Sequence, residues 1–99
     1  MPTKVVHCKR EPYDVYIGRG SKWGNPFRIG PDGTREEVIQ KYHANLIFRL
    51  SYDEENVIKE LAELKDKVLG CWCAPKACHG DVIARFVDWA ADKLENQET

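Results

Sequence analysis

The fold is decided by residues 67–81, KVLGCWCAPKACHGD. Residues 67–73 are apolar enough to form a buried strand, and Pro75 is expected to end it. Residues 74–80 then form a loop, and apolar side chains at helical spacing follow over residues 81–94. A strand that leads through a loop into a helix is typical of an α/β domain, and open α/β sheets favour ligand sites at such corners.

Two further strands are expected near the start of the chain. Residues 4–8 and 14–18 are short and rich in β-branched and aromatic side chains, and residues 11–14 form a turn before the second strand. Together with the third strand they predict a short sheet of about three strands.

Two capping boxes predict two helices in the middle of the chain. Thr34 is followed three residues later by Glu37, and Ser51 is followed three residues later by Glu54. We therefore expect one helix to begin after Thr34 and a second to begin after Ser51. The predicted order is ββααβα, a small α/β fold with about three helices, and residues 1–99 are expected to form a single domain.

A second dense segment, YIGRGSKWGNPF, occupies residues 16–27. Its glycines lack the spacing of the dinucleotide-binding pattern, but such a backbone can offer N–H groups to an anion. Arg19 and Lys22 would add charge, and Trp23 would add a face for stacking. The alternative is a tight loop held in the core by Trp23 and Phe27. The expected ligand-binding residues are Gly18, Arg19, Gly20, Ser21, Lys22, Trp23, Gly24 and Asn25.

The formal net charge of −1 conceals an uneven distribution of charge. The first 30 residues contain six basic and two acidic side chains, and the rest contain nine basic and fourteen acidic ones. A locally basic loop suits a small anionic or nucleotide-like partner. Binding of nucleic acid is less favoured but stays open, because no basic stripe follows a helix.

Three of the four cysteines lie close together at the end of the third predicted strand. Cys78 precedes a helix, and the N–H groups of a helix N-terminus can lower the pKa of a thiol. Cys78 is therefore a candidate nucleophile, with His79 and Asp81 as candidate acid, base or orienting groups. These three residues are the expected catalytic set, although whether the protein is an enzyme stays open.

Two other interpretations of the cysteines remain. Cys71, Cys73, Cys78 and His79 are ligands of the types that zinc prefers, although their spacing differs from common zinc motifs. Zinc is thus the cofactor that this alternative would require. In the other interpretation, Cys71 and Cys73 are simply small buried residues of the core.

The location expected from the sequence is the cytoplasm. No apolar run approaches the roughly 20 residues that span a bilayer, and the first residues do not resemble a signal peptide. Thiols stay reduced in that compartment, so clustered cysteines there more often indicate metal binding or catalysis than disulfides.

Both dense segments resemble the motifs of a family of small bacterial and phage proteins, the domain of unknown function 4326 family. The matching motifs are the Tyr-Ile-Gly-Arg and Ser-Lys-Trp-Gly-Asn-Pro-Phe pattern within residues 16–27, and the Cys-Trp-Cys-x-Pro and Cys-His-Gly-Asp pattern within residues 71–81. The resemblance covers most of the chain. It implies a shared site but no established activity.

The leading hypothesis is a pocket between residues 18–27 and residues 71–81 that binds a nucleotide-like or phosphorylated molecule, with or without cysteine-dependent catalysis. The first alternative is a zinc-binding module without catalysis. The second is a phage or bacterial accessory protein that contacts a partner through Trp23 and Trp72. The sequence does not indicate an oligomeric state.

Overall fold

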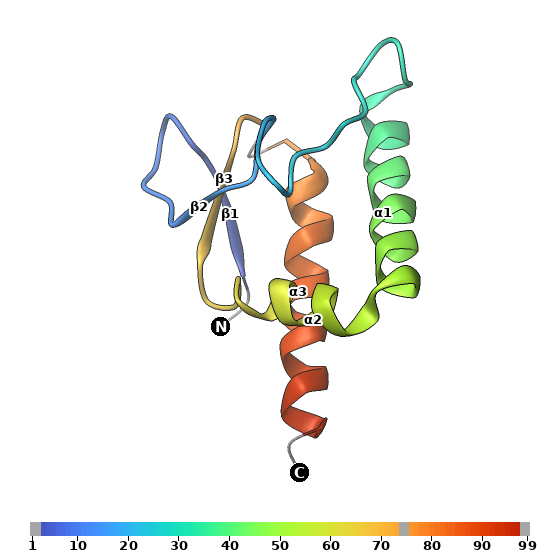
Figure 1. Ribbon diagram of the computed structural model, residues 1–99. Helices are drawn as coiled ribbons and strands as arrows, with labels where there is room; N and C mark the ends of the chain where they lie inside the picture. The colour runs from blue at the N-terminus through green and yellow to red at the C-terminus, as the bar shows by residue number, and fades with distance from the viewer. Residues whose placement is uncertain (1–2, 74–75, 98–99) are drawn as a thin grey trace.

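The computed structural model describes residues 3–73 and 76–97 (Figure 1). Its elements are β1 (Lys4–His7), β2 (Val15–Tyr16), α1 (Arg35–Tyr52), α2 (Glu54–Ala62), β3 (Val68–Cys71) and α3 (His79–Gln97). The predicted α/β fold and the order ββααβα are confirmed.

The three strands form a parallel sheet in the order β1-β3-β2. Leu69 in the central strand is paired with Val5 on one side and with Val15 on the other. Because the strands are parallel, their carboxyl ends lie at one edge of the sheet. In Figure 1 this edge is at the top, near the first turns of α1 and α3.

The helices lie on one side of the sheet and enclose the core with it (Figure 1). Helix α3 contacts β1 and both other helices. The largest fully buried side chains come from the sheet, from the loop after β2 and from all three helices: Ile17, Leu46, Leu61, Leu69, Ile83, Val87 and Cys71. On the sheet itself, the ring of Tyr13 covers Gly70, where any β-carbon would lie 2.6 Å from the ring.

The first predicted capping box is confirmed. The Thr34 hydroxyl accepts a hydrogen bond from the Glu37 N–H at 3.2 Å, and the Glu37 carboxylate accepts one from the Thr34 N–H at 3.0 Å. This reciprocal pair satisfies two N–H groups that the first turn of a helix leaves without partners. It fixes where α1 begins, at Arg35.

The second predicted capping box is wrong. Ser51 lies inside α1, and its hydroxyl donates to the Phe48 carbonyl at 2.9 Å instead of capping a new helix. Helix α1 continues to Tyr52 because Leu46 and Leu50 still face the core. Asp53 then precedes α2 without a side-chain capping bond.

The ends of other elements also differ from the prediction. Strand β3 ends at Cys71, so Trp72 and Cys73 lie beyond it and do not alternate as strand residues. Helix α3 begins at His79 and not at the predicted Asp81, whose carboxylate instead accepts the N–H of Cys78 just before the helix. The expected end of the strand at Pro75, and the part of the loop over residues 74–75, lie outside the described residues.

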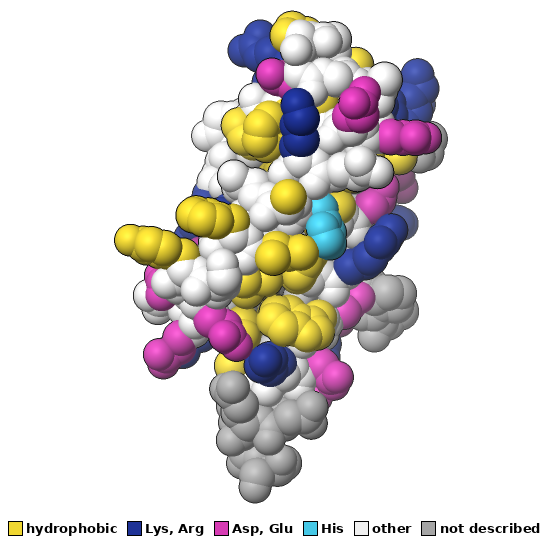
Figure 2. All heavy atoms as spheres, turned by 90° about the vertical axis from the view of Figure 1, so that its right-hand side faces the viewer, with side chains coloured by type: hydrophobic (Ala, Val, Ile, Leu, Met, Phe, Trp, Pro, Cys, Tyr) yellow, Lys and Arg dark blue, Asp and Glu magenta, His cyan; other side chains and the backbone are white. Residues whose placement is uncertain are grey.

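The side of the molecule formed by α1 carries exposed apolar side chains (Figure 2). Phe48 and Tyr52 on α1 are exposed, and their rings stack with centroids 6.4 Å apart; Trp89 on α3 is also exposed. None of the helices in the described part of the chain has the length and apolar character needed to cross a membrane.

Candidate functional site

A cavity of about 350 Å³ opens at the carboxyl edge of the sheet. Residues from both dense segments line it, although these segments lie far apart along the chain. The first segment contributes Tyr16, Gly18, Arg19, Asn25 and Phe27. The position agrees with the general preference of parallel α/β sheets for ligand sites beyond the carboxyl ends of their strands.

The second dense segment supplies the opposite part of the cavity wall. Trp72 and Cys73 follow β3, and Cys78 and His79 stand at the start of α3. The sequence predicted that residues 18–27 and 71–81 share a pocket, and the structure brings part of each segment to one cavity.

Two direct hydrogen bonds hold the segments together. Nε2 of His79 lies 2.7 Å from the carbonyl oxygen of Ile17, and the Trp72 indole N–H donates to the Tyr16 hydroxyl at 3.0 Å. A β-carbon on Gly80, the residue after His79, would lie 2.9 Å from the Ile17 side chain. The helix therefore approaches the loop as closely as a glycine permits.

Helix α1 forms a third wall that the sequence analysis did not anticipate. Arg35, Val38 and Ile39 lie on one face of its first two turns and line the cavity, as does Ile29. Their spacing of three and four residues is the signal that could have placed them together. The Arg35 guanidinium donates to the Ala77 carbonyl at 3.1 Å, which joins α1 to the cysteine segment.

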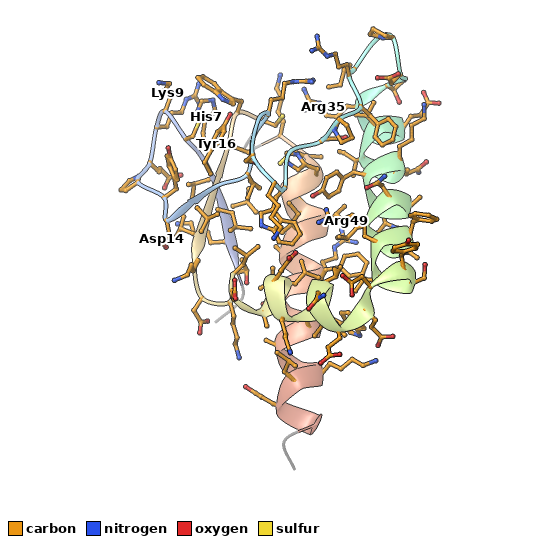
Figure 3. All side chains as sticks on the ribbon, viewed as in Figure 1. His7, Lys9, Asp14, Tyr16, Arg35 and Arg49 are labelled. Atoms are coloured by element: carbon orange, nitrogen blue, oxygen red, sulfur yellow. The ribbon has the colours of Figure 1, made fainter. Side chains whose placement is uncertain are left out.

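The charge of the lining is positive. Arg19 and Arg35 line the cavity, and none of the described lining residues is acidic. Neither arginine forms an ion pair with a described carboxylate. Figure 3 shows Arg35 near the start of α1 and Tyr16 near the upper, carboxyl end of the strands. Two guanidinium groups without carboxylate partners suit an anion.

Asn25 lines the cavity but uses its side chain to hold the loop. Its amide N–H₂ donates to the Val38 carbonyl at 3.2 Å, and its amide oxygen accepts from the Phe27 N–H at 2.9 Å. Asn25 therefore positions Phe27 and ties the glycine-rich segment to α1.

Five of the expected ligand-binding residues do not line this cavity: Gly20, Ser21, Lys22, Trp23 and Gly24. Lys22 instead pairs with Glu60 of α2 at 2.7 Å. Ser21 closes the turn, since its hydroxyl donates to the Gly18 carbonyl at 2.6 Å.

Trp23 belongs to the core. It is 5% exposed, the Tyr42 hydroxyl donates to its carbonyl at 2.8 Å, and the Arg49 guanidinium lies 5.3 Å from the centre of its ring. The alternative interpretation, a loop held in the core by Trp23 and Phe27, therefore holds for Trp23 but not for Phe27, which is partly buried and lines the cavity. Trp23 is too buried to offer a contact surface, in contrast to Trp72, which is 54% exposed.

The Cys78 thiol is buried beside a second thiol. Its sulfur lies 3.3 Å from the sulfur of Cys71 and also accepts the Gly80 N–H at 3.3 Å. The contact with Cys71 and burial raise the pKa of Cys78 well above that of a free thiol, although the Gly80 N–H opposes them. The expectation that the helix N-terminus lowers this pKa is wrong, because the neighbouring thiol and burial outweigh it.

His79 is 7% exposed, and burial lowers its pKa, while the contact with the Ile17 carbonyl opposes the shift. The ring is therefore neutral at physiological pH. A carbonyl only accepts hydrogen bonds, so we assign the proton to Nε2, which leaves Nδ1 as an acceptor. Nδ1 has no hydrogen-bond partner within residues 3–73 and 76–97.

Asp81 lies outside the cavity lining. Its carboxylate accepts the Cys78 N–H at 3.1 Å, which completes the first turn of α3. Asp81 thus orients Cys78 through the backbone.

The four cysteine and histidine side chains of the zinc hypothesis are not assembled into one site. Cys73 and Cys78 line the cavity, whereas Cys71 does not, and His79 is engaged with Ile17. No group of three or more histidine, cysteine, aspartate or glutamate side chains in the described part of the chain could hold a metal ion.

Fold and site define a class of protein: a small parallel α/β domain with a cationic, partly aromatic cavity at the carboxyl ends of its strands. The chain belongs to the family described as domain of unknown function (DUF4326), whose model matches residues 3–89. The resemblance seen in the two dense segments is therefore confirmed at the level of the family.

Two viral relatives are similar over most of this chain. It is 40% identical to the "Uncharacterized 12.4 kDa protein in nrdA-td intergenic region" of Enterobacteria phage T4, over 86% of this chain and 77% of that protein. It is 37% identical to "Uncharacterized protein R718" of Acanthamoeba polyphaga mimivirus, over 74% of this chain and 65% of that protein. No solved structure matches the chain.

Proposed function

We propose that the cavity binds a small phosphorylated molecule of the nucleotide type. The observation that carries this proposal is the lining itself. Arg19 and Arg35 bring two positive charges to a cavity whose described walls contain no carboxylate. An anionic ligand would supply the charge that the lining lacks.

The phosphate would lie between the two arginines. A guanidinium group can donate two parallel hydrogen bonds to phosphate oxygens, which fixes orientation as well as charge. Arg35 is partly buried and already held by the Ala77 carbonyl, so it would lose little side-chain freedom on binding.

The planar part of the ligand would contact the apolar walls. Phe27, Tyr16 and Trp72 line the cavity and offer aromatic surface. A volume of about 350 Å³ is within the range of small-molecule sites. Nδ1 of His79, which has no hydrogen-bond partner among the described residues, would accept a hydrogen bond from an N–H or O–H group of the ligand.

Cysteine-dependent catalysis stays a prediction and is secondary to binding in this proposal. Cys78 lines the cavity, but its raised pKa keeps the thiol protonated. Catalysis through Cys78 would require the ligand to displace the contact with Cys71. The expected cytoplasmic location also stays a prediction.

Isothermal titration calorimetry of the full chain tests the proposal. The panel contains the four ribonucleoside monophosphates, ribose 5-phosphate, inorganic phosphate and adenosine. We expect at least one nucleoside monophosphate to bind more tightly than adenosine, because only the phosphate engages the arginines.

Charge-removing variants locate the binding. Arg19→Gln and Arg35→Gln should each weaken binding by about tenfold or more, since a hydrogen bond to a charged group contributes about 1.5–3 kcal/mol. Arg28→Gln is the matched control, because Arg28 is exposed in the same loop and does not line the cavity. Absence of binding across the panel, or equal weakening by the control, would refute the proposal.

A further inference from the structure

Two cysteine side chains face each other at the cavity, Cys78 in its lining and Cys71 outside the lining. The sulfur atoms of Cys71 and Cys78 are 3.3 Å apart, and the residues are 1% and 3% exposed. Cys71 ends the central strand and Cys78 immediately precedes α3. The pair thus joins the end of β3 to the start of α3.

The backbone holds both cysteines in place. The Cys71 carbonyl accepts a hydrogen bond at 2.8 Å from the N–H of Cys8, the residue after β1. The Cys78 N–H donates to the Asp81 carboxylate at 3.1 Å. A disulfide has a sulfur–sulfur distance of about 2.05 Å, so the two sulfurs need to approach by only about 1.3 Å.

We propose that Cys71 and Cys78 form a reversible intramolecular disulfide, a modification site at the edge of the cavity that takes a small disulfide such as glutathione disulfide as oxidant. The site is independent of the identity of the ligand. It concerns the covalent state of the cavity wall, whereas the proposed function concerns what the cavity binds.

The reaction proceeds by two exchange steps. Cys78 lines the cavity and Cys71 does not, so Cys78 meets the oxidant first. The Cys78 thiol loses its proton to water, and the resulting thiolate attacks one sulfur of glutathione disulfide; this forms a mixed disulfide and releases one glutathione thiolate, which takes up a proton. Cys71 then loses its proton and attacks the Cys78 sulfur, which forms the Cys71–Cys78 bond and releases the second glutathione. The protein loses two hydrogen atoms, and one glutathione disulfide is reduced to two glutathione molecules.

The competing partner is Cys73, which also lines the cavity. It is partly buried and lies beyond the end of β3, and Cys8 is partly buried after β1. The 3.3 Å contact joins Cys78 to Cys71 and not to either of these residues. The structure therefore selects one pairing among those that the four cysteines allow.

The full chain, purified under reducing conditions, would be equilibrated in glutathione buffers of increasing oxidised fraction. Equilibration is preferable to a rate measurement, because burial and a protonated thiol slow the exchange. After acid quenching and alkylation, intact mass spectrometry counts the remaining thiols, and a proteolytic map identifies the linked peptides.

We expect a species that has lost two hydrogen atoms and retains two alkylatable thiols, with Cys71 linked to Cys78. Cys8→Ser and Cys73→Ser should still form the Cys71–Cys78 link, with one alkylatable thiol left, and Cys71→Ser should not form it. The wild-type peptide map decides the pairing even if Cys71→Ser does not fold. A Cys73–Cys78 link, glutathione adducts alone, four free thiols in the most oxidising buffer, or stoichiometric zinc on the cysteines would each overturn the inference. None of these outcomes changes the calorimetric test of ligand binding.

Discussion

Nε2 of His79 lies 2.7 Å from the carbonyl oxygen of Ile17, although the two residues are separated by 62 positions in the chain. This hydrogen bond connects the first turn of α3 to the loop that follows β2. The ring of His79 also meets the Tyr42 ring edge-on, with centroids 5.0 Å apart. The neutral imidazole thus joins two of the segments that line the cavity and also contacts α1, which supplies a third wall.

The protein should lose stability as the pH falls below about 6.5. Burial lowers the pKa of His79 from its ordinary value of 6.5, so the unfolded chain takes up a proton at this residue before the folded chain does. The contribution is complete above the unfolded pKa and decreases as the pH falls toward the folded one. Urea unfolding between pH 5 and pH 8 measures it.

His79→Gln should flatten that part of the pH profile and should lower stability by about 1–3 kcal/mol at neutral pH, because a buried hydrogen bond and packing are disturbed. His43→Gln is the control, since His43 is exposed on α1. An unchanged profile in His79→Gln would contradict the assignment.

Gly24→Ala should disrupt the loop more than Gly20→Ala does. A β-carbon on Gly24 would lie 2.6 Å from the Gly18 carbonyl oxygen, which is backbone and cannot move aside cheaply. Gly20 has open space around it but a positive φ of 86°, so alanine there costs only about 1 kcal/mol of strain. Thermal unfolding compares the two, and a smaller loss for Gly24→Ala would contradict the predicted order.

Thr34→Ala should destabilise the protein by about 1 kcal/mol, because the Thr34 hydroxyl caps the first turn of α1. Ser51→Ala should have little effect, because Ser51 lies inside the helix and its hydroxyl caps nothing. Chemical denaturation of the two variants gives the comparison. Equal losses would mean that Thr34 does not act as a cap.

Lys22→Ala should leave ligand affinity unchanged. Lys22 points to Glu60 on α2 and not into the cavity, so its removal alters a partly exposed ion pair worth about 0–1 kcal/mol of stability. Calorimetry with the nucleotide that binds best provides the measurement, beside Arg19→Gln as the variant expected to weaken binding. Comparable weakening by both would extend the ligand site beyond the cavity lining.

The elements were predictable because their signals are local. The Thr34 cap, the apolar strand that ends in Cys71 and the apolar spacing of α3 each occupy one short stretch of sequence. Ser51 shows the limit of such signals. A capping pattern predicts a helix start only if the preceding helix has ended, and core contacts of Leu50 carry α1 past Ser51.

The sequence predicted the two segments that line the cavity, but only three of its eight expected ligand-binding residues line it, and Arg35 was not among them. Lys22 forms an ion pair with Glu60, and Arg35 donates a hydrogen bond to the Ala77 carbonyl. Both contacts depend on how elements distant in the sequence pack together. The pKa of Cys78 illustrates the same point. Its place before a helix indicates a lowered value, whereas the Cys71 thiol that reverses the direction becomes its neighbour only through the fold.

The central position of β3 also sets an order of events during folding. Strands β1 and β2 each pair with β3, so no parallel ladder can form until residues 68–71 have reached them across the intervening helices. Helices α1 and α2 rely on local contacts and can form early, whereas parallel pairing between distant segments is slow. The cavity takes one wall from the chain beyond β3, so it is completed only when β3 docks. A substitution that delays this docking would postpone the appearance of ligand binding during refolding, even if the final stability were unchanged.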